Sequence, residues 1–319
     1  MRRRVYNLEL PSGCHEMTIY EYRFSRVEDY VQKINRLQQP VNISSEFRIK
    51  ANTGRHTVTA YVDLPDVERE AVFEWYGNKA TALDDILLLL SVFGSRDVFL
   101  GSEEATDDNE LIIRQDPRVY LYGGSLSCSV PYKRGEKGSE HNYPCNLGFQ
   151  EAMNKIYSLI RTEKWLKKYR NGYFIILARN AFRQQSLESS FIQAWTIWEH
   201  LFAVLNGHWL SKERLRQVSS VEKVSFLLVQ YALKDEIDND SRKRIEVLAE
   251  IRNRLIHFGR FPARDKVSQD AHLFILLTEF IIAKILELEP SNVFNTVEKL
   301  EDFLKYSEAA AKKASSTKA

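Results

Sequence analysis

Residues 241–259 read SRKRIEVLAEIRNRLIHFG, and this stretch has the period of an amphipathic helix that ends at Gly259. Arg252 lies within the apolar side of the helical wheel, whereas Asn253 and His257 lie one turn apart on the polar side. A helix with so broad an apolar side is typical of a helical bundle. That side is made of Ile245, Val247, Leu248, Ala249, Ile251, Leu255, Ile256 and Phe258.

Two residues of this helix are unusual for a purely structural element. Arg252 carries a permanent charge inside an apolar stripe, where an unpaired guanidinium is costly, so it needs a partner or a wet interface. His257 lies in the last helical turn, where the negative end of the helix dipole favours an imidazolium. The structural alternatives are an ion pair for Arg252 and hydrogen bonds to free helix carbonyls for His257.

The residues around this helix continue the helical pattern. They predict an all-α helical bundle over residues 147–306, followed by a flexible tail, 307–319, that is rich in Ala, Lys and Ser. The periods that predict the bundle run over Phe149–Arg161, Tyr173–Gln184, Leu187–Leu205, Val221–Leu233, Ser241–His257 and Ala271–Leu288.

The first 146 residues mix strand and helix signals and predict a separate α+β N-terminal domain. One predicted helix covers Val27–Leu37 after a capping-box spacing that begins at Ser25, and another covers Ile86–Phe93 after Thr81–Asp84. Two hairpins are expected, one around residues 11–13 and one across residues 52–54. Their strands, with two further short ones, are Val5–Leu10, Glu16–Phe24, Glu46–Lys50, Thr57–Val62, Val98–Leu100 and Arg118–Tyr122.

Composition limits the function classes. The chain has 319 residues, 44% of them hydrophobic and 28% charged, which is ordinary for a globular protein. No apolar run approaches the roughly 20 residues of a membrane span, and the basic start is not followed by an apolar stretch, so we expect a cytoplasmic protein with no membrane partner. Net charge is −4 over residues 1–150 and +6 over 151–319, which makes the second half the better candidate for binding a polyanion.

The three cysteines fit reduced thiols better than a disulfide framework, because they are odd in number and form no C-x-x-C pair. Cys128, His141 and Cys145 have a spacing that zinc tolerates, and a fourth ligand would have to come from Cys14 or His15. The usual paired first half of a zinc motif is missing. The sequence therefore predicts buried or incidental thiols, with no metal and no cofactor.

The run Arg252-Asn253-x-x-x-His257 resembles the R-N-x-x-x-H form of the motif of the HEPN superfamily. The position of this run at the end of a bundle helix agrees with that motif. Glu199 agrees with it too, because it lies in an earlier, strongly apolar helix, where such families commonly carry an acidic residue. With a mixed α/β region in front, the chain looks most like the ApeA-type HEPN proteins of bacterial anti-phage defence. The resemblance covers about residues 150–290.

This resemblance implies a metal-independent endoribonuclease that uses the RNA 2′-hydroxyl as its nucleophile. His257 would act as general base or acid, and Arg252 would hold the scissile phosphate. Asn253 would orient His257 or donate to phosphate, and Glu199 would hold Arg252 by a charge-assisted hydrogen bond. The N-terminal domain, 1–146, would sense a trigger such as a phage component and restrain the enzyme.

One helix does not present the whole motif on one face, because Arg252 and His257 lie about 140° apart at 100° per residue. Either the helix loosens at its end or a second copy completes the site. The family solution is a homodimer, so we expect dimerisation through the helical domain with Arg252 near the seam.

Several basic residues are candidate RNA contacts beside the motif. Arg254, Arg260 and Arg264 flank it, and Lys167 and Lys168 lie in a segment interleaved with Trp165 and Tyr169. The structural alternative for all of them is a solvated surface. The alternative for the whole chain is a non-catalytic HEPN module that serves interaction or dimerisation.

Overall fold

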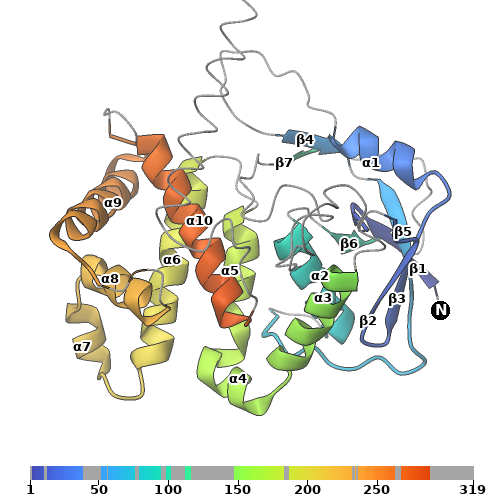
Figure 1. Ribbon diagram of the computed structural model, residues 1–319, viewed down its shortest axis with the longest axis horizontal. Coiled ribbons are helices and arrows are strands. Elements are labelled where there is room, and N and C mark those ends of the chain that lie inside the picture. Colours follow the sequence, from blue (N-terminus) through green and yellow to red (C-terminus); the bar gives the residue numbers. More distant parts are fainter. Residues whose placement is uncertain are drawn as a thin grey trace, which may run out of the picture.

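A computed structural model shows an antiparallel sheet region followed by a mostly helical part, as the sequence predicts (Figure 1). It describes residues 2–10, 13–38, 52–55, 57–75, 79–94, 98–101, 112–115, 147–182, 187–231, 234, 236–262 and 267–287. The expected strands at 46–50 and 118–122, the boundary at 146 and the tail from 307 lie outside these residues.

The main sheet has the strand order β2-β3-β5-β1-β6. Each described pairing in it is antiparallel, and β5 is the central strand, with its first residues buried. A small second sheet pairs β4 with β7. The strands are β1 (Arg2–Tyr6), β2 (Glu16–Ile19), β3 (Tyr22–Arg26), β4 (Asn52–Arg55), β5 (Val58–Asp63), β6 (Phe99–Leu100) and β7 (Ile112–Gln115).

Both predicted hairpins are wrong in their pairing. The stretch Glu16–Phe24 folds on itself, because β2 and β3 pair across Tyr20 and Glu21, while β1 pairs with β5 and β6 instead. Tyr20 takes the left-handed conformation that this tight turn requires, with φ 56°. Asn52–Arg55, expected as a turn, is the strand that pairs with β7.

The two helices of the sheet region differ in how well their starts are predicted. α1 (Tyr30–Gln38) begins later than expected, because Ser25 and Arg26 belong to β3 rather than to a capping box. α2 (Ala82–Gly94) begins as expected, and the Asp84 carboxylate accepts hydrogen bonds from the Thr81 N–H and hydroxyl at 2.7 and 3.2 Å.

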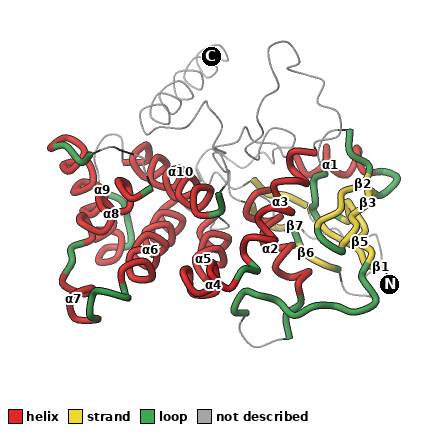
Figure 2. The backbone as a smooth tube through the Cα atoms, turned by 60° about the horizontal axis from the view of Figure 1, so that its bottom comes forward, coloured by secondary structure: helices red, strands yellow, loops and turns green. Residues whose placement is uncertain are grey.

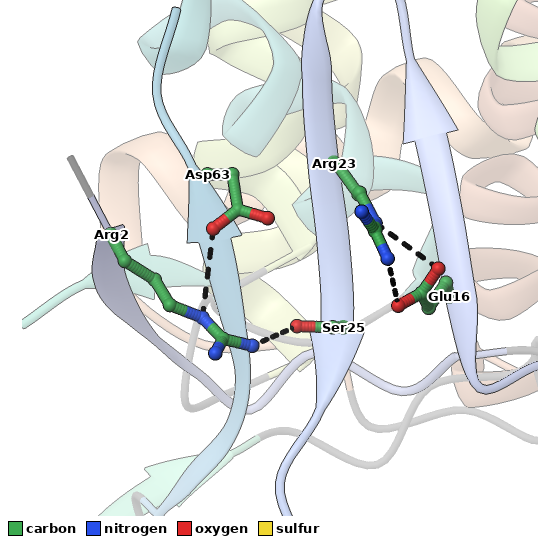
Figure 3. A network of polar contacts seen from close by, with 5 residues as sticks. All are labelled: Arg2, Glu16, Arg23, Ser25 and Asp63. Atoms are coloured by element: carbon green, nitrogen blue, oxygen red, sulfur yellow. Dashed lines mark hydrogen bonds and ion pairs between the residues drawn. The ribbon is translucent and has the colours of Figure 1, made fainter.

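Charged side chains on one exposed side of the sheet give Arg2 its partners. Arg2 on β1 pairs with Asp63 on β5 and donates to Ser25 on β3, and Arg23 pairs with Glu16 across β2 and β3 (Figure 3). Because the side chains of these pairs are about half exposed, the pairs contribute little to stability. The paired side chains neutralise one another's charge on a solvated face of the sheet.

Each helix predicted in the second half is present. Two short helices, α4 and α7, were not predicted, because six or seven residues show no convincing period. The helices are α3 (Leu147–Ile160), α4 (Glu163–Tyr169), α5 (Tyr173–Phe182), α6 (Leu187–Asn206), α7 (Lys212–Gln217), α8 (Ser220–Gln230), α9 (Asn239–Phe258) and α10 (Val267–Ile285), with a short 3-10 turn, η1 (Arg170–Gly172), before α5.

Helices α2 and α3 lie between the sheet and the helical part (Figures 1 and 2). Asn154 on α3 ties the β2–β3 turn by accepting from the Tyr20 N–H at 2.7 Å and donating to the Thr18 carbonyl at 2.9 Å. On the other side α2 packs against α5. The buried apolar side chains consequently form one cluster that runs through both parts.

Candidate functional site

The candidate site lies on α9, which is a regular helix to its last residue. Asp238 caps its start by accepting from the Ser241 N–H at 2.7 Å. Gly259 ends it in the left-handed conformation, with φ 68° and its N–H bonded to the Leu255 carbonyl. Because the helix does not loosen before Gly259, Arg252 and His257 keep their separation of about 140° within one chain.

Glu199 on α6 lies where three helices meet. Its Oε1 accepts from the indole of Trp195, one turn earlier, at 3.1 Å and from the hydroxyl of Ser220 at the start of α8 at 3.0 Å. The same oxygen lies 3.6 Å from Nη2 of Arg252 on α9. The carboxylate is therefore positioned by α6 and α8 and faces the guanidinium of α9.

Arg252 has the partner that its apolar surroundings demand. Its side chain is 30% exposed and that of Glu199 is 31% exposed. The contact is an ion pair rather than the expected hydrogen bond, because 3.6 Å is too long for one. Nη1 of Arg252 also donates to Oδ1 of Asn253 at 3.0 Å, so the Asn253 oxygen faces Arg252 and not His257.

Trp195, Glu199, Ser220, Arg252 and Asn253 form the Glu199 cluster. His257 is exposed and lies apart from this cluster. The Phe258 ring lies 6.4 Å from the His257 ring between centroids, and within the described ranges no contact joins the imidazole to Arg252 or Glu199. Ile256 and Phe258, which the wheel places on the apolar side, are 49% and 70% exposed. The end of α9 thus presents a histidine between two uncovered apolar side chains.

The other predicted RNA contacts have ordinary surface partners. Arg254 lies 3.9 Å from Glu250 one turn away, and Arg260 is exposed just after the helix cap, whereas Arg264 lies outside the described residues. On α4, Lys167 pairs with Glu163 at 2.5 Å, and the Lys168 ammonium lies 5.0 Å from the centre of the Tyr169 ring.

The aromatic side chains interleaved with these lysines belong to the core. Trp165 and Tyr169 are only 5% and 4% exposed, and their rings pack against each other and against Phe174. They are therefore unable to stack on RNA bases, and the part of the prediction that relied on them is wrong.

The described residues contain neither a candidate metal cluster nor a membrane-spanning helix. Cys128, His141 and Cys145 lie outside the described residues, and within the described ones no cluster of three or more His, Cys, Asp or Glu could hold a metal ion. Cys14 is buried but disulfide-bonded, so it differs from the expected reduced thiol. No helix of the described segments is long and apolar enough to cross a membrane.

Ser220 is a member of the cluster that sequence reasoning missed. A signal for it was available, because Ser219 and Glu222 have capping-box spacing and form that box in the structure. The box starts α8 at Ser220 and so places its hydroxyl at the helix end that meets Glu199.

Comparison with known proteins identifies no match for this chain. The chain matches no protein-family model, no curated protein and no solved structure.

Proposed function

We propose that this protein is a metal-independent endoribonuclease of the HEPN type, with Arg252 and His257 as its catalytic residues. The observation that supports this most strongly is the Glu199–Arg252 pair. A guanidinium that is 30% exposed and faces a fixed carboxylate is suited to binding a phosphate, and the exposed His257 on the same helix is suited to act as a general base or acid.

The proposed reaction needs no metal. The 2′-oxygen of the RNA attacks the adjacent phosphorus while the P–O5′ bond breaks, which leaves a 2′,3′-cyclic phosphate and a 5′-hydroxyl. His257 either accepts the 2′-hydroxyl proton or supplies the proton to the departing 5′-oxygen. Arg252 stabilises the charge that develops on the phosphate oxygens, and Glu199 acts as a positioning residue for it.

A homodimer would reconcile this reaction with the helix geometry. Since α9 stays helical to Phe258, one copy does not bring His257 next to its own Arg252. Ile256 and Phe258, exposed on either side of His257, are the side chains that a second copy would cover. In this proposal the N-terminal part restrains the enzyme until a trigger, such as a phage component, binds.

The test is cleavage of a mixed tRNA and mRNA pool in EDTA, followed by mapping of the RNA ends. The wild type should leave 2′,3′-cyclic phosphate ends, and His257→Ala should lower the rate by about 10²–10⁴-fold. Arg252→Ala should remove activity and Arg252→Lys should restore only part of it. His208→Ala, which changes an exposed histidine outside the cluster, is the matched control and should cleave like the wild type.

Restraint by the N-terminal part is tested by repeating the assay in lysate from phage-infected cells. Cleavage that appears only there supports a gated enzyme. If the wild type cleaves no RNA in either setting, the proposal is wrong.

A second candidate function is supported by the exposed apolar pair at the end of α9. Ile256 and Phe258 also suit a non-catalytic interaction or dimerisation module. In that case Phe258→Glu should abolish self-association measured by sedimentation, while the wild type forms dimers and shows no RNA cleavage.

A further inference from the structure

A cavity of about 230 Å³ lies between α8, α9 and α10. Its walls are apolar and come from Val224 and Leu228 on α8, Ile245 and Leu248 on α9, and Leu277 on α10. This volume exceeds the roughly 150 Å³ of an apolar cavity that admits benzene, so the space is sufficient for a ring system of one or two fused rings.

An aromatic side chain lines the cavity and connects it to the Glu199 cluster. Phe274 on α10 is stacked against Trp195 at 4.9 Å and Trp198 at 5.1 Å between ring centroids. Trp195 in turn donates to Glu199. Phe274 is itself 0% exposed, so it offers no free ring face for stacking, and a ligand in the cavity would lie two side chains away from the carboxylate that faces Arg252.

The charged side chains that line the cavity balance one another. They are two basic residues, Lys234 and Arg244, and two acidic residues, Asp238 and Asp240. Arg244 pairs with Asp270 at 3.6 Å, and Asp238 caps α9, which lowers the pKa of its carboxyl. With no excess of either sign, the rim disfavours a phosphate and suits a neutral ring whose edge both donates and accepts hydrogen bonds.

The cavity and Arg252 share one stripe of α9. Ser241, Ile245 and Leu248 line the cavity, and Arg252 follows Leu248 by one turn, about 6 Å further along the axis. The same holds on α8, where Val224 lines the cavity and Ser220, one turn earlier, contacts Glu199. His257 lies on the other side of α9.

We propose that this cavity binds one nucleobase, as the base subsite of an RNA whose phosphate is held at Arg252. The size, the apolar walls and the charge-balanced rim match a neutral heteroaromatic ring, and the shared stripe places a phosphate next to it. This inference rests on the proposed ribonuclease function for the source of the base. The shared chemistry is a nucleobase, which either an RNA or a free nucleoside can supply.

The experiment measures binding rather than cleavage. Adenosine, guanosine, cytidine and uridine are titrated into the full chain by calorimetry, with Val224→Phe to fill the cavity and Val229→Phe as the matched control on the same helix. Val229 is 41% exposed and does not line the cavity, whereas Val224 is 2% exposed. We expect the wild type and Val229→Phe to bind at least one nucleoside and Val224→Phe to bind it at least tenfold more weakly.

A measurement on the wild type keeps the test valid if Val224→Phe does not fold. Methyl-labelled protein with the bound nucleoside should show nuclear Overhauser effects between base protons and the methyl groups of Leu248 or Leu277. Absence of nucleoside binding at millimolar concentration, or binding without these effects, overturns the proposal.

A 2′-deoxy oligonucleotide distinguishes the two sources, because it lacks the 2′-hydroxyl and is not cleaved. If it competes with the nucleoside, the cavity is a subsite for a nucleic-acid chain; if it does not, the cavity takes a free nucleoside and the subsite assignment is wrong. Nucleoside binding in a protein that cleaves no RNA would refute the ribonuclease and leave the base pocket standing. RNA cleavage without nucleoside binding in the cavity would support the ribonuclease and refute the base pocket.

Discussion

Arg252 shows how much a single residue can reveal when it departs from a periodic pattern. A charge on the apolar side of a helix predicts a partner, and the structure places Glu199 opposite it. Since both side chains are about 30% exposed, the pair is worth no more than about 1 kcal/mol of stability. Its main effect is to orient the guanidinium.

Asp85 on α2 is a buried residue that the sequence does not mark as special. It is 0% exposed and accepts hydrogen bonds from the Val72 N–H at 2.6 Å, the Trp75 indole at 2.9 Å and the Phe73 N–H at 3.4 Å. Burial raises the pKa of its carboxyl to about 6, although these hydrogen bonds oppose the shift.

This shift predicts a pH-dependent stability difference between the wild type and Asp85→Asn. Because the folded pKa of about 6 exceeds the ordinary value of 3.8, the stabilisation from this proton is full below about pH 4 and is lost as the pH rises through about 6. As the pH falls from 7 to 4, the wild type should gain about 2–3 kcal/mol over the variant, at about 1.4 kcal/mol per pKa unit. Urea unfolding of both proteins at each pH measures this, and a constant difference would contradict it.

At the scale of elements, the helices follow from local signals and the strand partners do not. The cap at Gly259 is a clear case, because glycine takes φ 68° there without strain. The pairing of β1 with β5 joins residues more than fifty positions apart, and no turn signal specifies such a partner. For this reason the positions of β5 and β6 are predicted from the sequence, whereas Glu16–Phe24 is expected as one strand paired with the wrong neighbour and Asn52–Arg55 is expected as a turn.

Gly259→Ala should destabilise the protein by about 1 kcal/mol. A Cβ at this position would have no heavy atom within 4 Å, so the cost comes from the backbone conformation and not from overlap. Gly259→Asn should cost less, because asparagine tolerates the left-handed region better. Guanidinium unfolding of the three proteins gives the order, and equal stability of the alanine variant would show that the cap adapts freely.

At the scale of the whole molecule, the sheet region and the helical part share one core. Phe73, in the loop held by Asp85, packs against Gly172 in η1 and is 4% exposed. A Cβ on Gly172 would lie 2.6 Å from Cε1 of Phe73 and 2.9 Å from Cη2 of Trp165. This contact joins the part proposed to sense a trigger to the part proposed to cleave RNA.

The contact predicts that substitutions at Phe73 and Gly172 are not additive. Gly172→Ala should cost more than about 2 kcal/mol, because its φ of 69° adds backbone strain to the overlap. In a Phe73→Ala background part of the overlap disappears, so the same substitution should cost about 1 kcal/mol less. A double-mutant cycle from urea unfolding measures the coupling, and additive effects would show that Phe73 does not carry it.

The sequence by itself determined the helices of the second half, the cap at Gly259 and the anomaly at Arg252. These follow from hydrogen bonds and side-chain spacing within one or two helical turns. Tertiary structure alone decided the strand order, the burial of Trp165 and Tyr169, the exposure of Ile256 and Phe258, and the cavity beside Leu248. Those features depend on which distant surfaces meet, and a helical period reports that a face is apolar without reporting what covers it.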